Sequence, residues 1–510
     1  MRQVLQKLFN EINMQNKYDV AIIGSGLGGL VCGYILSKNG YKVAIFEQGA
    51  QAGGCLQTFT RKGVKFETGV HYIGSMGEGQ TLNLFFKYLS LFKDLKLSPL
   101  DATGFDVISF KNEQYKYATG YENFIDTLSQ KFPTEHNNIK QYAQKIREIV
   151  MSSPFHSIHS SEEALQFSSN YATTTVNDFV AQQTSNEVLQ NVLVGLVPLY
   201  AGIKDKTPLY VHAFINDSNI SGACRIMGGS DKIADSLLHS IRSFGGEIFL
   251  LSKVSKIVCD STKATSLVLE NGTQIEADYF ISNTHPEITV DMIDSHLIRH
   301  VFRNRIRQME QTVAYFTVYL KFKENKVPYM NHNFYHYSGK EVWNCENYTQ
   351  EDWPRGYLYM HLCPEQPSFY AQTGEIITIM NFDEVAQWAG TKVEQRGEAY
   401  KAFKKQKAEK LLARLESQFP GTLANIEAYY TSTPLTYLNY TGTIKGGAYG
   451  VLRDVNTPRI VHRTRIPNLF FVGQNTNSHG IMGVIIGSII TCSEFLGREF
   501  LWEQIKNCKS

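Results

Sequence analysis

The stretch Asp19-Val-Ala-Ile-Ile-Gly24-Ser-Gly26-Leu-Gly-Gly29 decides the fold of this 510-residue chain. Asp19 to Ile23 is a short apolar run that ends in glycine, which is typical of a buried parallel strand. Leu27 to Asn39 predicts a helix that stops at Gly40, and Lys42 to Phe46 predicts a second strand. The segment is therefore expected to form a βαβ unit.

The three glycines of this unit have distinct expected roles. Gly24 permits a tight turn, Gly26 lets the backbone approach a pyrophosphate, and Gly29 lets the helix pack closely on the strand. The start of the helix then offers free N–H groups to the phosphates. Glu47 ends the second predicted strand, where a carboxylate can accept both ribose hydroxyls of an adenosine and would repel a 2′-phosphate. A chance glycine-rich turn in a parallel sheet is the alternative interpretation.

Two further glycine-rich elements distinguish FAD from NAD. Gly53 and Gly54 follow Glu47 closely, where a backbone without Cβ can pass near a cofactor. At the other end of the chain, a predicted strand at Asn468 to Val472 leads into a loop and a helix predicted at Ile481 to Phe500. The glycines of this second element are Gly473, Gly480 and Gly483. Two halves at opposite ends of the chain predict one elongated ligand that bridges them, which favours FAD.

The rest of the chain predicts one more block of this domain and a second, discontinuous domain. Residues 222–285 predict a turn at Gly228-Gly229, a helix over Ser230 to Phe244 and short strands within 248–258, 267–269 and 275–281. Elsewhere we predict helices at 185–196 and 398–418 and a strand at 313–322. The predicted domains are an FAD-binding domain formed by residues 17–81, 222–286 and 438–500, and a substrate domain formed by residues 82–221 and 287–437.

Composition excludes some functions and favours others. Lys and Arg total 50 against 48 for Asp and Glu, so charge gives no reason to expect a nucleic-acid partner. The eight cysteines form no C-x-x-C pair, which predicts neither a metal site nor disulfides and fits a reducing compartment. An aromatic content of 12% suits a pocket for a long apolar ligand. The sequence leaves the oligomeric state open.

We expect a cytoplasmic protein, because no segment resembles a signal peptide or is long enough to cross a bilayer. Two segments allow peripheral contact with a membrane surface. One is an apolar helix face over Val4 to Ile12, which a start at Met14 would remove, and the other is the basic amphipathic stretch Leu297 to Arg307. A packed terminal extension and an ordinary surface helix are the respective alternatives.

Several motifs, spread over nearly the whole chain, resemble those of the flavin-dependent family of phytoene desaturases, amine oxidases and carotenoid isomerases. Within this family, the motifs resemble those of the retinol saturase branch most. The motifs are Gly53-Gly-Cys-Leu-Gln-Thr58, Phe66-Glu-Thr-Gly-Val-His-Tyr-Ile-Gly74, Gly228-Gly-Ser230, Ser432-Thr-Pro-Leu-Thr436, Gly447-Ala-Tyr-Gly450 and Ile466-Pro-Asn-Leu469.

This resemblance implies an α/β fold with a Rossmann-like, glutathione-reductase-type FAD-binding domain and a mixed α+β substrate domain. It implies that backbone groups of Val254 contact the adenine. Cys55 stands where many family members have an Arg near the cofactor, so a donor to the phosphates is missing or comes from elsewhere. The chain has no second G-x-G-x-x-G after a strand, so an NAD(P)H donor would dock transiently or be replaced by a protein.

The implied activity is redox chemistry on a C=C bond of a long apolar polyene or isoprenoid lipid, with saturation favoured. Desaturation and cis–trans isomerisation on the same scaffold are alternatives, followed by amine oxidation and by a flavin-bearing carrier without turnover. His71 and Tyr72 are the candidate catalytic residues, because the family brings the loop after Gly69 near the flavin. A purely structural role for His71 is an equal alternative.

Overall fold

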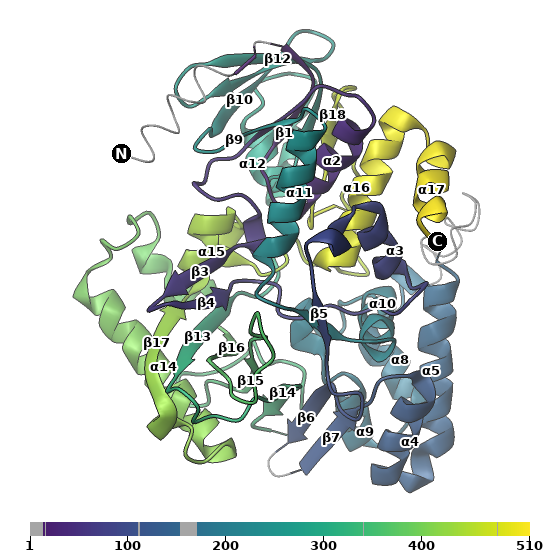
Figure 1. Cartoon of the computed structure of the whole chain (residues 1–510), viewed down its shortest axis with the longest axis vertical. Helices are drawn as coiled ribbons and strands as arrows, with labels where there is room; N and C mark the ends of the chain where they lie inside the picture. The colour runs from purple at the N-terminus through teal and green to yellow at the C-terminus, as the bar shows by residue number, and fades with distance from the viewer. Residues whose placement is uncertain are drawn as a thin grey trace.

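Two seven-stranded β-sheets organise the chain (Figure 1). This computed structural model describes residues 14–15, 17–110, 113–153, 171–339, 341–476 and 478–509. The first sheet contains β1 Lys17–Ile23, β2 Val43–Phe46, β9 Glu247–Phe249, β10 Val254–Cys259, β11 Ala264–Leu269, β12 Gln274–Ser282 and β18 Leu469–Phe471. The second contains β6 Asp106–Phe110, β7 Glu113–Tyr117, β13 Tyr315–Phe322, β14 Asn333–Tyr337, β15 Gly356–His361, β16 Thr373–Ile379 and β17 Ile426–Ser432.

Shorter ladders and helices complete the fold. The ladders pair β3 Thr58–Arg61 with β4 Val64–Glu67, and β5 Leu97–Pro99 with β8 Cys224–Ile226. The helices packed on the first sheet or near it are α2 Leu27–Lys38, α3 Thr81–Tyr88, α11 Asp231–Ser243, α12 Pro286–Asp291, α13 His300–Arg307, α16 Gly480–Leu496 and α17 Arg498–Lys506. The others are α4 Tyr121–Lys131, α5 His136–Met151, α8 Val176–Gln183, α9 Glu187–Leu193, α10 Leu209–Ile220, α14 Gly397–Gln418 and α15 Pro434–Thr441.

The centre of the first sheet is β12, which joins the two ends of the chain. It pairs in parallel with β1, where Ile23 lies opposite Ser282. On its other side it pairs in parallel with β18, where Ser282 lies opposite Phe471. Because parallel strands end at the same edge, the loops after these three strands lie next to one another. This is the edge at which ligands bind in open α/β sheets.

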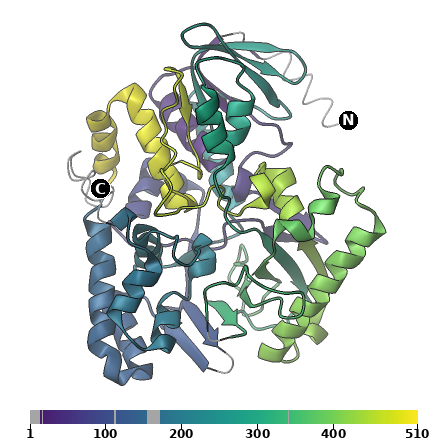
Figure 2. The same ribbon diagram turned by 180° about the vertical axis from the view of Figure 1, so that it is seen from behind.

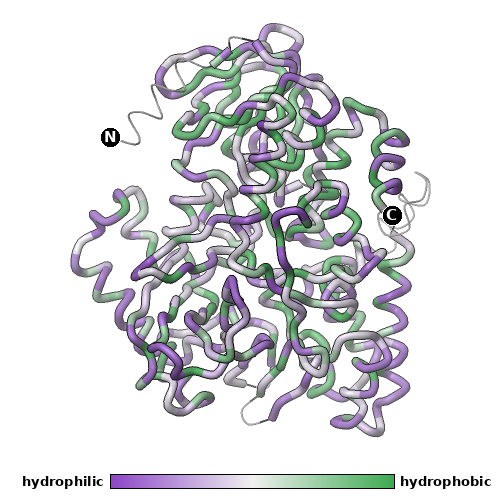
Figure 3. The backbone as a smooth tube through the Cα atoms, in the orientation of Figure 1, coloured by the Kyte–Doolittle hydropathy of each residue, from purple (hydrophilic) through white to green (hydrophobic). Residues whose placement is uncertain are grey.

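Alternation along β1 produces a hydrophobic layer on each face of this sheet. Val20 and Ile22 pack with α2, α11 and α16 on one face. The rear view shows these helices beside the sheet (Figure 2). Ala21 and Ile23 pack on the other face with β10, β11 and α12. Apolar residues accordingly concentrate along these central strands and helices (Figure 3). Such burial on both faces is characteristic of the parallel strands of α/β folds.

The predicted βαβ unit is confirmed, and so are the helices expected near Ser230 and Glu398. The prediction of one helix over Ile481 to Phe500 is wrong. The helix ends at Leu496, because Gly497 adopts φ 80, and α17 begins at Arg498. The division into two domains stays a prediction, although strands of the first sheet do come from residues 17–46, 247–282 and 469–471.

Residues 300–307 of the predicted basic stretch form α13, and two of its arginines bind neighbouring residues of the same chain. Arg303 donates hydrogen bonds to the carbonyl groups of Val290 and Ile293, and Arg307 pairs with Asp291. Membrane contact through this segment stays a prediction, and the helix predicted over residues 4–12 lies outside the described residues. Among the helices that the structure describes, none combines the length and apolar character needed to cross a membrane.

Gly29→Ala is expected to destabilise the protein by about 1–3 kcal/mol, because the new methyl group must displace backbone. A Cβ at Gly29 would lie 2.1 Å from the carbonyl oxygen of Gly24. Gly339→Ala is the control, since Gly339 is exposed and a Cβ placed there would lie 3.9 Å from its nearest neighbouring atom. Urea denaturation measures both free energies of unfolding, and equal values would contradict the close packing of α2 on β1.

Candidate functional site

Two adjoining cavities open at the carboxyl edge of the first sheet. The smaller, about 150 Å³, contains five residues predicted to bind the adenosine and pyrophosphate: Gly24, Gly26, Glu47, Gly54 and Val254. The larger cavity, about 230 Å³, is lined by five residues predicted to bind the cofactor, Gly26, Gly53, Gly54, Gly473 and Gly480. It is also lined by His71, a predicted catalytic residue. Residues that border both cavities, Gly26, Gly54, Asn283 and His285 among them, make them one continuous site.

Three of the predicted site residues lie outside the lining of both cavities. Gly29 packs against Gly24 inside the turn, and a Cβ at Gly483 would lie 2.7 Å from the Cβ of Ser478. Tyr72 is buried behind the larger cavity, where its hydroxyl group donates to Asp106 at 3.1 Å and lies 2.7 Å from the hydroxyl of Tyr335. A direct role of Tyr72 in catalysis stays a prediction.

Asn283 lies between two of the glycine-bearing segments, residues 24–29 and Gly473. Its side chain donates a hydrogen bond to the carbonyl of Gly24 at 3.4 Å. A Cβ at Gly26 would lie 2.8 Å from this side chain, and a Cβ at Gly28 or at Gly473 would lie 2.6 Å from it. Larger residues at these glycines would therefore collide with Asn283. The sequence prediction missed this residue, although its place directly after a central strand could have indicated it.

Glu47 is held in a fixed orientation. Its carboxylate accepts hydrogen bonds from the backbone N–H of Ser25 at 3.0 Å, from the Ser25 hydroxyl at 2.6 Å and from the N–H of Gly49 at 2.7 Å. A carboxylate has about four acceptor sites, so capacity remains for a ligand hydroxyl. Val254, the first residue of β10, borders the same cavity.

Two helices begin at this site. The N-cap of α2 is Gly26, which has no side chain. The N-cap of α16 is His479, whose side chain makes no capping hydrogen bond. Leu27 and Ile481, the first or second residue of each helix, border the larger cavity. The uncapped N–H groups and the positive end of each helix dipole suit anionic phosphate and an electron-rich ring. Together with the glycine cradle, this geometry fits an elongated dinucleotide.

The wall of the larger cavity away from the glycines comes from the second sheet. Its residues are aromatic or aliphatic side chains of β13 to β16, namely Tyr315, Tyr337, Tyr357, Leu358, Ile377 and Ile379. Within the described part of the chain, the lining of this cavity includes no Asp, Glu, Lys or Arg. The cavity therefore favours an uncharged, apolar ligand.

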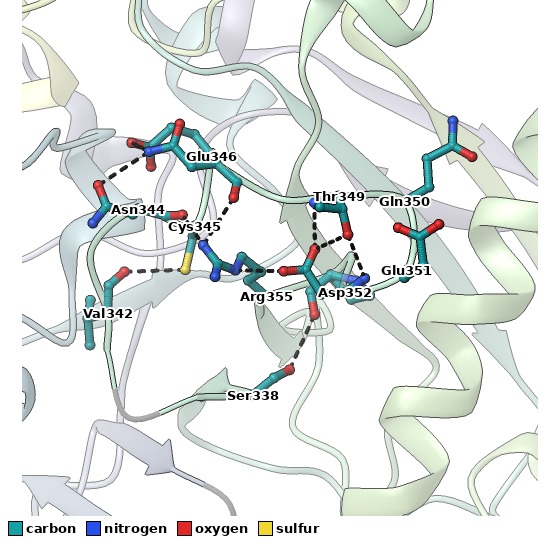
Figure 4. Close-up of polar contacts among 12 residues, drawn as sticks. Ser338, Val342, Asn344, Cys345, Glu346, Thr349, Gln350, Glu351, Asp352 and Arg355 are labelled. Atoms are coloured by element: carbon teal, nitrogen blue, oxygen red, sulfur yellow. Dashed lines mark hydrogen bonds and ion pairs between the residues drawn. The ribbon is translucent and has the colours of Figure 1, made fainter.

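Cys345 borders the same cavity from the loop that connects β14 to β15 (Figure 4). Its thiol donates to the carbonyl of Val342 at 3.2 Å. Arg355 fixes this loop, because its guanidinium donates to the carbonyl of Asn344 at 3.0 Å and pairs with Asp352 at 3.1 Å. Burial raises the pKa of Cys345 to about 12, so this thiol is neutral at physiological pH and acts as an apolar wall.

Behind His71, the guanidinium of Arg225 connects the loop to buried acids. It is 1% exposed and donates to the His71 carbonyl at 3.4 Å and to Asn333 at 2.8 Å, while Asn333 donates to Asp106 at 2.7 Å. Burial raises the pKa of Asp106 to about 7, against the opposing hydrogen bonds from Asn333 and Tyr72. Sequence reasoning missed Arg225 and Asp106, because no recognised motif includes either residue.

Asp106→Asn is expected to change how stability depends on pH. The folded protein binds the Asp106 proton more tightly than the unfolded chain, whose Asp pKa is about 4. Wild-type stability should therefore fall between pH 4 and 7 by up to about 1.4 kcal/mol per pH unit from this group, and the variant should lack that contribution. Urea denaturation at several pH values measures the difference, with exposed Asp126→Asn as the control. Parallel curves for wild type and Asp106→Asn would refute it.

Comparison with known proteins agrees with this geometry. The family described as flavin containing amine oxidoreductase matches residues 27–492. The chain is 25% identical to human all-trans-retinol 13,14-reductase, covering 100% of this chain and 90% of the relative. It is 23% identical to the chloroplastic prolycopene isomerase of Daucus carota, covering 97% and 82% respectively.

Solved structures share the fold. An oxidoreductase from Methanosarcina mazei superposes with a TM-score of 0.65 at 17% identity, over 94% of this chain and 100% of that one. At this identity the likeness shows the fold alone. The family match confirms the expected FAD cofactor and the expected FAD-dependent oxidoreductase. Since that match spans most of the sequence, the chain belongs to the flavin containing amine oxidoreductase family.

Proposed function

We propose that this protein reduces a carbon–carbon double bond in a long apolar polyene or isoprenoid lipid. The observation that carries the proposal is the larger cavity, which borders the glycine-rich end of the site and whose described lining has no charged carboxylate, ammonium or guanidinium group. Relatives that match nearly the whole chain are named for all-trans-retinol reduction and for prolycopene isomerisation, and both compounds are polyenes.

The same lining argues against amine oxidation. An amine substrate is protonated near neutral pH, and burying its ammonium group without an anionic partner costs more than contact with aromatic rings alone returns. The cavity supplies aromatic rings, such as Tyr315 and Tyr357, but the described lining contains no carboxylate. Desaturation and isomerisation use the same apolar cavity, and the isomerase-named relative makes isomerisation the second candidate.

FAD supplies hydride chemistry at its ring when bound, and the protein must position the double bond, exclude water and provide a proton. Gly24, Gly26 and Gly54 would hold the pyrophosphate side, and Gly473 and Gly480 the ring side. His71 borders the larger cavity and would donate the proton to the carbon next to the one that is reduced.

The decisive experiment offers all-trans-retinol to the flavin-loaded enzyme after anaerobic reduction with dithionite. We expect a product heavier than the substrate by one H₂, detected by mass spectrometry. An isomer of unchanged mass would establish the second candidate. Recovery of unchanged retinol and of unchanged carotenoids from parallel reactions would overturn the proposal, and so would ammonia release from an amine.

His71→Gln should lower the rate of product formation by roughly 100-fold or more, because an amide cannot deliver a proton at neutral pH. Flavin content should not change, since His71 is expected to act on the substrate. His239→Gln, on the exposed surface of α11, is the matched control and should keep the wild-type rate. A His71→Gln enzyme that turns over normally would assign this residue a structural role.

Glu47→Ala should weaken FAD binding by about 10–100-fold, because one or two charge-assisted hydrogen bonds to the ribose are lost. Fluorescence titration of flavin-free protein measures the dissociation constant. Glu276→Ala removes an exposed carboxylate from β12 of the same sheet and should leave the affinity unchanged. An equal loss of affinity in both variants would contradict a contact of Glu47 with the cofactor.

A further inference from the structure

Two buried glutamates meet at the ring of His71. The Nδ1 atom of His71 lies 3.2 Å from Oε2 of Glu375 and 3.7 Å from Oε2 of Glu67. Neither Nδ1 nor Oε2 of Glu375 has a hydrogen-bond partner elsewhere among the described residues. The other oxygen of Glu375 accepts a hydrogen bond from the backbone N–H of Glu67 at 3.1 Å. Both carboxyl groups thus converge on one nitrogen.

The two glutamates come from elements that the fold brings together from far apart in the sequence. Glu67 is the last residue of β4 and is 6% exposed, and Glu375 lies on β16 and is 0% exposed. His71 borders the larger cavity, with Nδ1 buried and turned toward the carboxyl groups. Its second ring nitrogen, Nε2, is therefore the atom available to a ligand in the cavity.

The charge balance around this cluster requires bound protons. Arg225 is the buried cation near it, while Glu67, Glu375 and Asp106 are three buried acids. Ionising all three would leave buried negative charge without a partner, which costs several kcal/mol. Burial raises the pKa of Glu67, and burial together with the adjacent Glu67 raises that of Glu375. A proton is thus stored between the two glutamates and His71.

We propose that Glu67 and Glu375 form a shared proton store that recharges His71 during reduction of the double bond. This proposal rests on the proposed function of the cavity. Glu375 and Glu67 are positioning residues here, because they act through the imidazole ring. Three features support the proposal: both carboxyl groups reach Nδ1, both are shut off from solvent, and His71 connects them to the cavity.

Reduction of the double bond consumes one hydride and one proton. FAD, bound and reduced by two electrons with dithionite, would supply the hydride to one carbon of the double bond. The π-electron pair then forms a bond between the neighbouring carbon and the proton on Nε2 of His71. Nδ1 accepts a proton from Glu375, and Glu67 shares the negative charge that remains until solvent returns a proton. The substrate gains H₂, and the flavin is oxidised by two electrons.

Other titratable groups face this cluster from every element packed against it. Arg225 on β8 favours the ionised form of both glutamates, which opposes the effect of burial. The remaining groups that interact with one of the glutamates are Tyr319 on β13, Cys363 after β15 and Tyr437 on α15. Burial raises the pKa of all three, so they stay neutral across the pH range of the test.

The first test detects the stored proton without substrate. The infrared spectrum of the flavin-loaded enzyme at neutral pH should contain a carbonyl band of a protonated carboxylic acid, which shifts in D₂O. Glu375→Gln should remove this band. Asp106→Asn is the matched control, because Asp106 is another buried acid but is not among the two acids paired with His71, and it should remove a different band. If wild type and Glu375→Gln have identical spectra in this region, the proposal fails.

The second test follows product formation in single turnovers from pH 5 to 9. With Glu375→Gln, the fall in rate with increasing pH should begin at lower pH than in wild type, because no buried acid then supplies a proton to Nδ1 and the proton must come from solvent. The loss should be about 10-fold or more at pH 8 and smaller at pH 6. Glu375→Asp should restore part of the wild-type profile. A merely structural role would lower the rate equally at every pH.

The outcomes separate this proposal from the proposed function. If wild type forms no reduced product while the infrared band is present, the proposed function fails. If wild type reduces retinol but Glu375→Gln retains both its band and its pH profile, the proton store fails and the reductase remains. If Glu375→Gln does not fold, the same infrared test is made with Glu67→Gln. Loss of the D₂O-sensitive wild-type band in that variant then supports the proton store, and an unchanged band contradicts it.

Discussion

The parallel pairing of β12 with β1 on one side and with β18 on the other is the constraint on which the site depends. Parallel strands end at a common edge, so this pairing forces the loops after Ile23, Ser282 and Phe471 into contact. Asn283 fills the space between them and leaves no room for a side chain at Gly26, Gly28 or Gly473. The glycine pattern is thus a packing requirement as well as a binding feature.

The site is apolar on the side of the cavity that the second sheet lines, and it is polar and ionisable behind that cavity. Toward the cavity, the second sheet presents rings and aliphatic side chains, and the described lining contains no Asp, Glu, Lys or Arg. Behind the cavity, Arg225 lies near buried acids: Asn333 accepts from Arg225 and donates to Asp106, and Glu375 accepts from the backbone N–H of Glu67. His71 lies at the boundary between the two regions, which separates an apolar ligand from the ionisable groups that assist its conversion.

Much of the first sheet could be predicted from the sequence, because its strands are short, apolar and terminated by glycine, and the βαβ unit follows from local patterns alone. The cofactor was predictable for the same reason, since Gly24, Gly26, Glu47 and Gly473 stand in or beside such patterns. Arg225, Asp106 and Glu375 were not, because their significance depends on contacts between distant segments, such as the pairing of β6 with β14 and of β15 with β16, that no local motif encodes. The helix break at Gly497 was missed because apolar periodicity continues across it.

The joining of β1 to β12 and of β12 to β18 also has a consequence for biosynthesis. The strand that completes the central sheet begins at Leu469, roughly 450 residues after β1 has left the ribosome. Until then, residues 280–282 of β12 have no neighbour on that side, because β11 pairs only with residues 274–276, and this open edge could pair with other chains. Nascent copies therefore keep this edge open to such pairing until β18 has been made, so chaperone protection during translation should matter more here than for a chain whose nucleotide-binding half is contiguous.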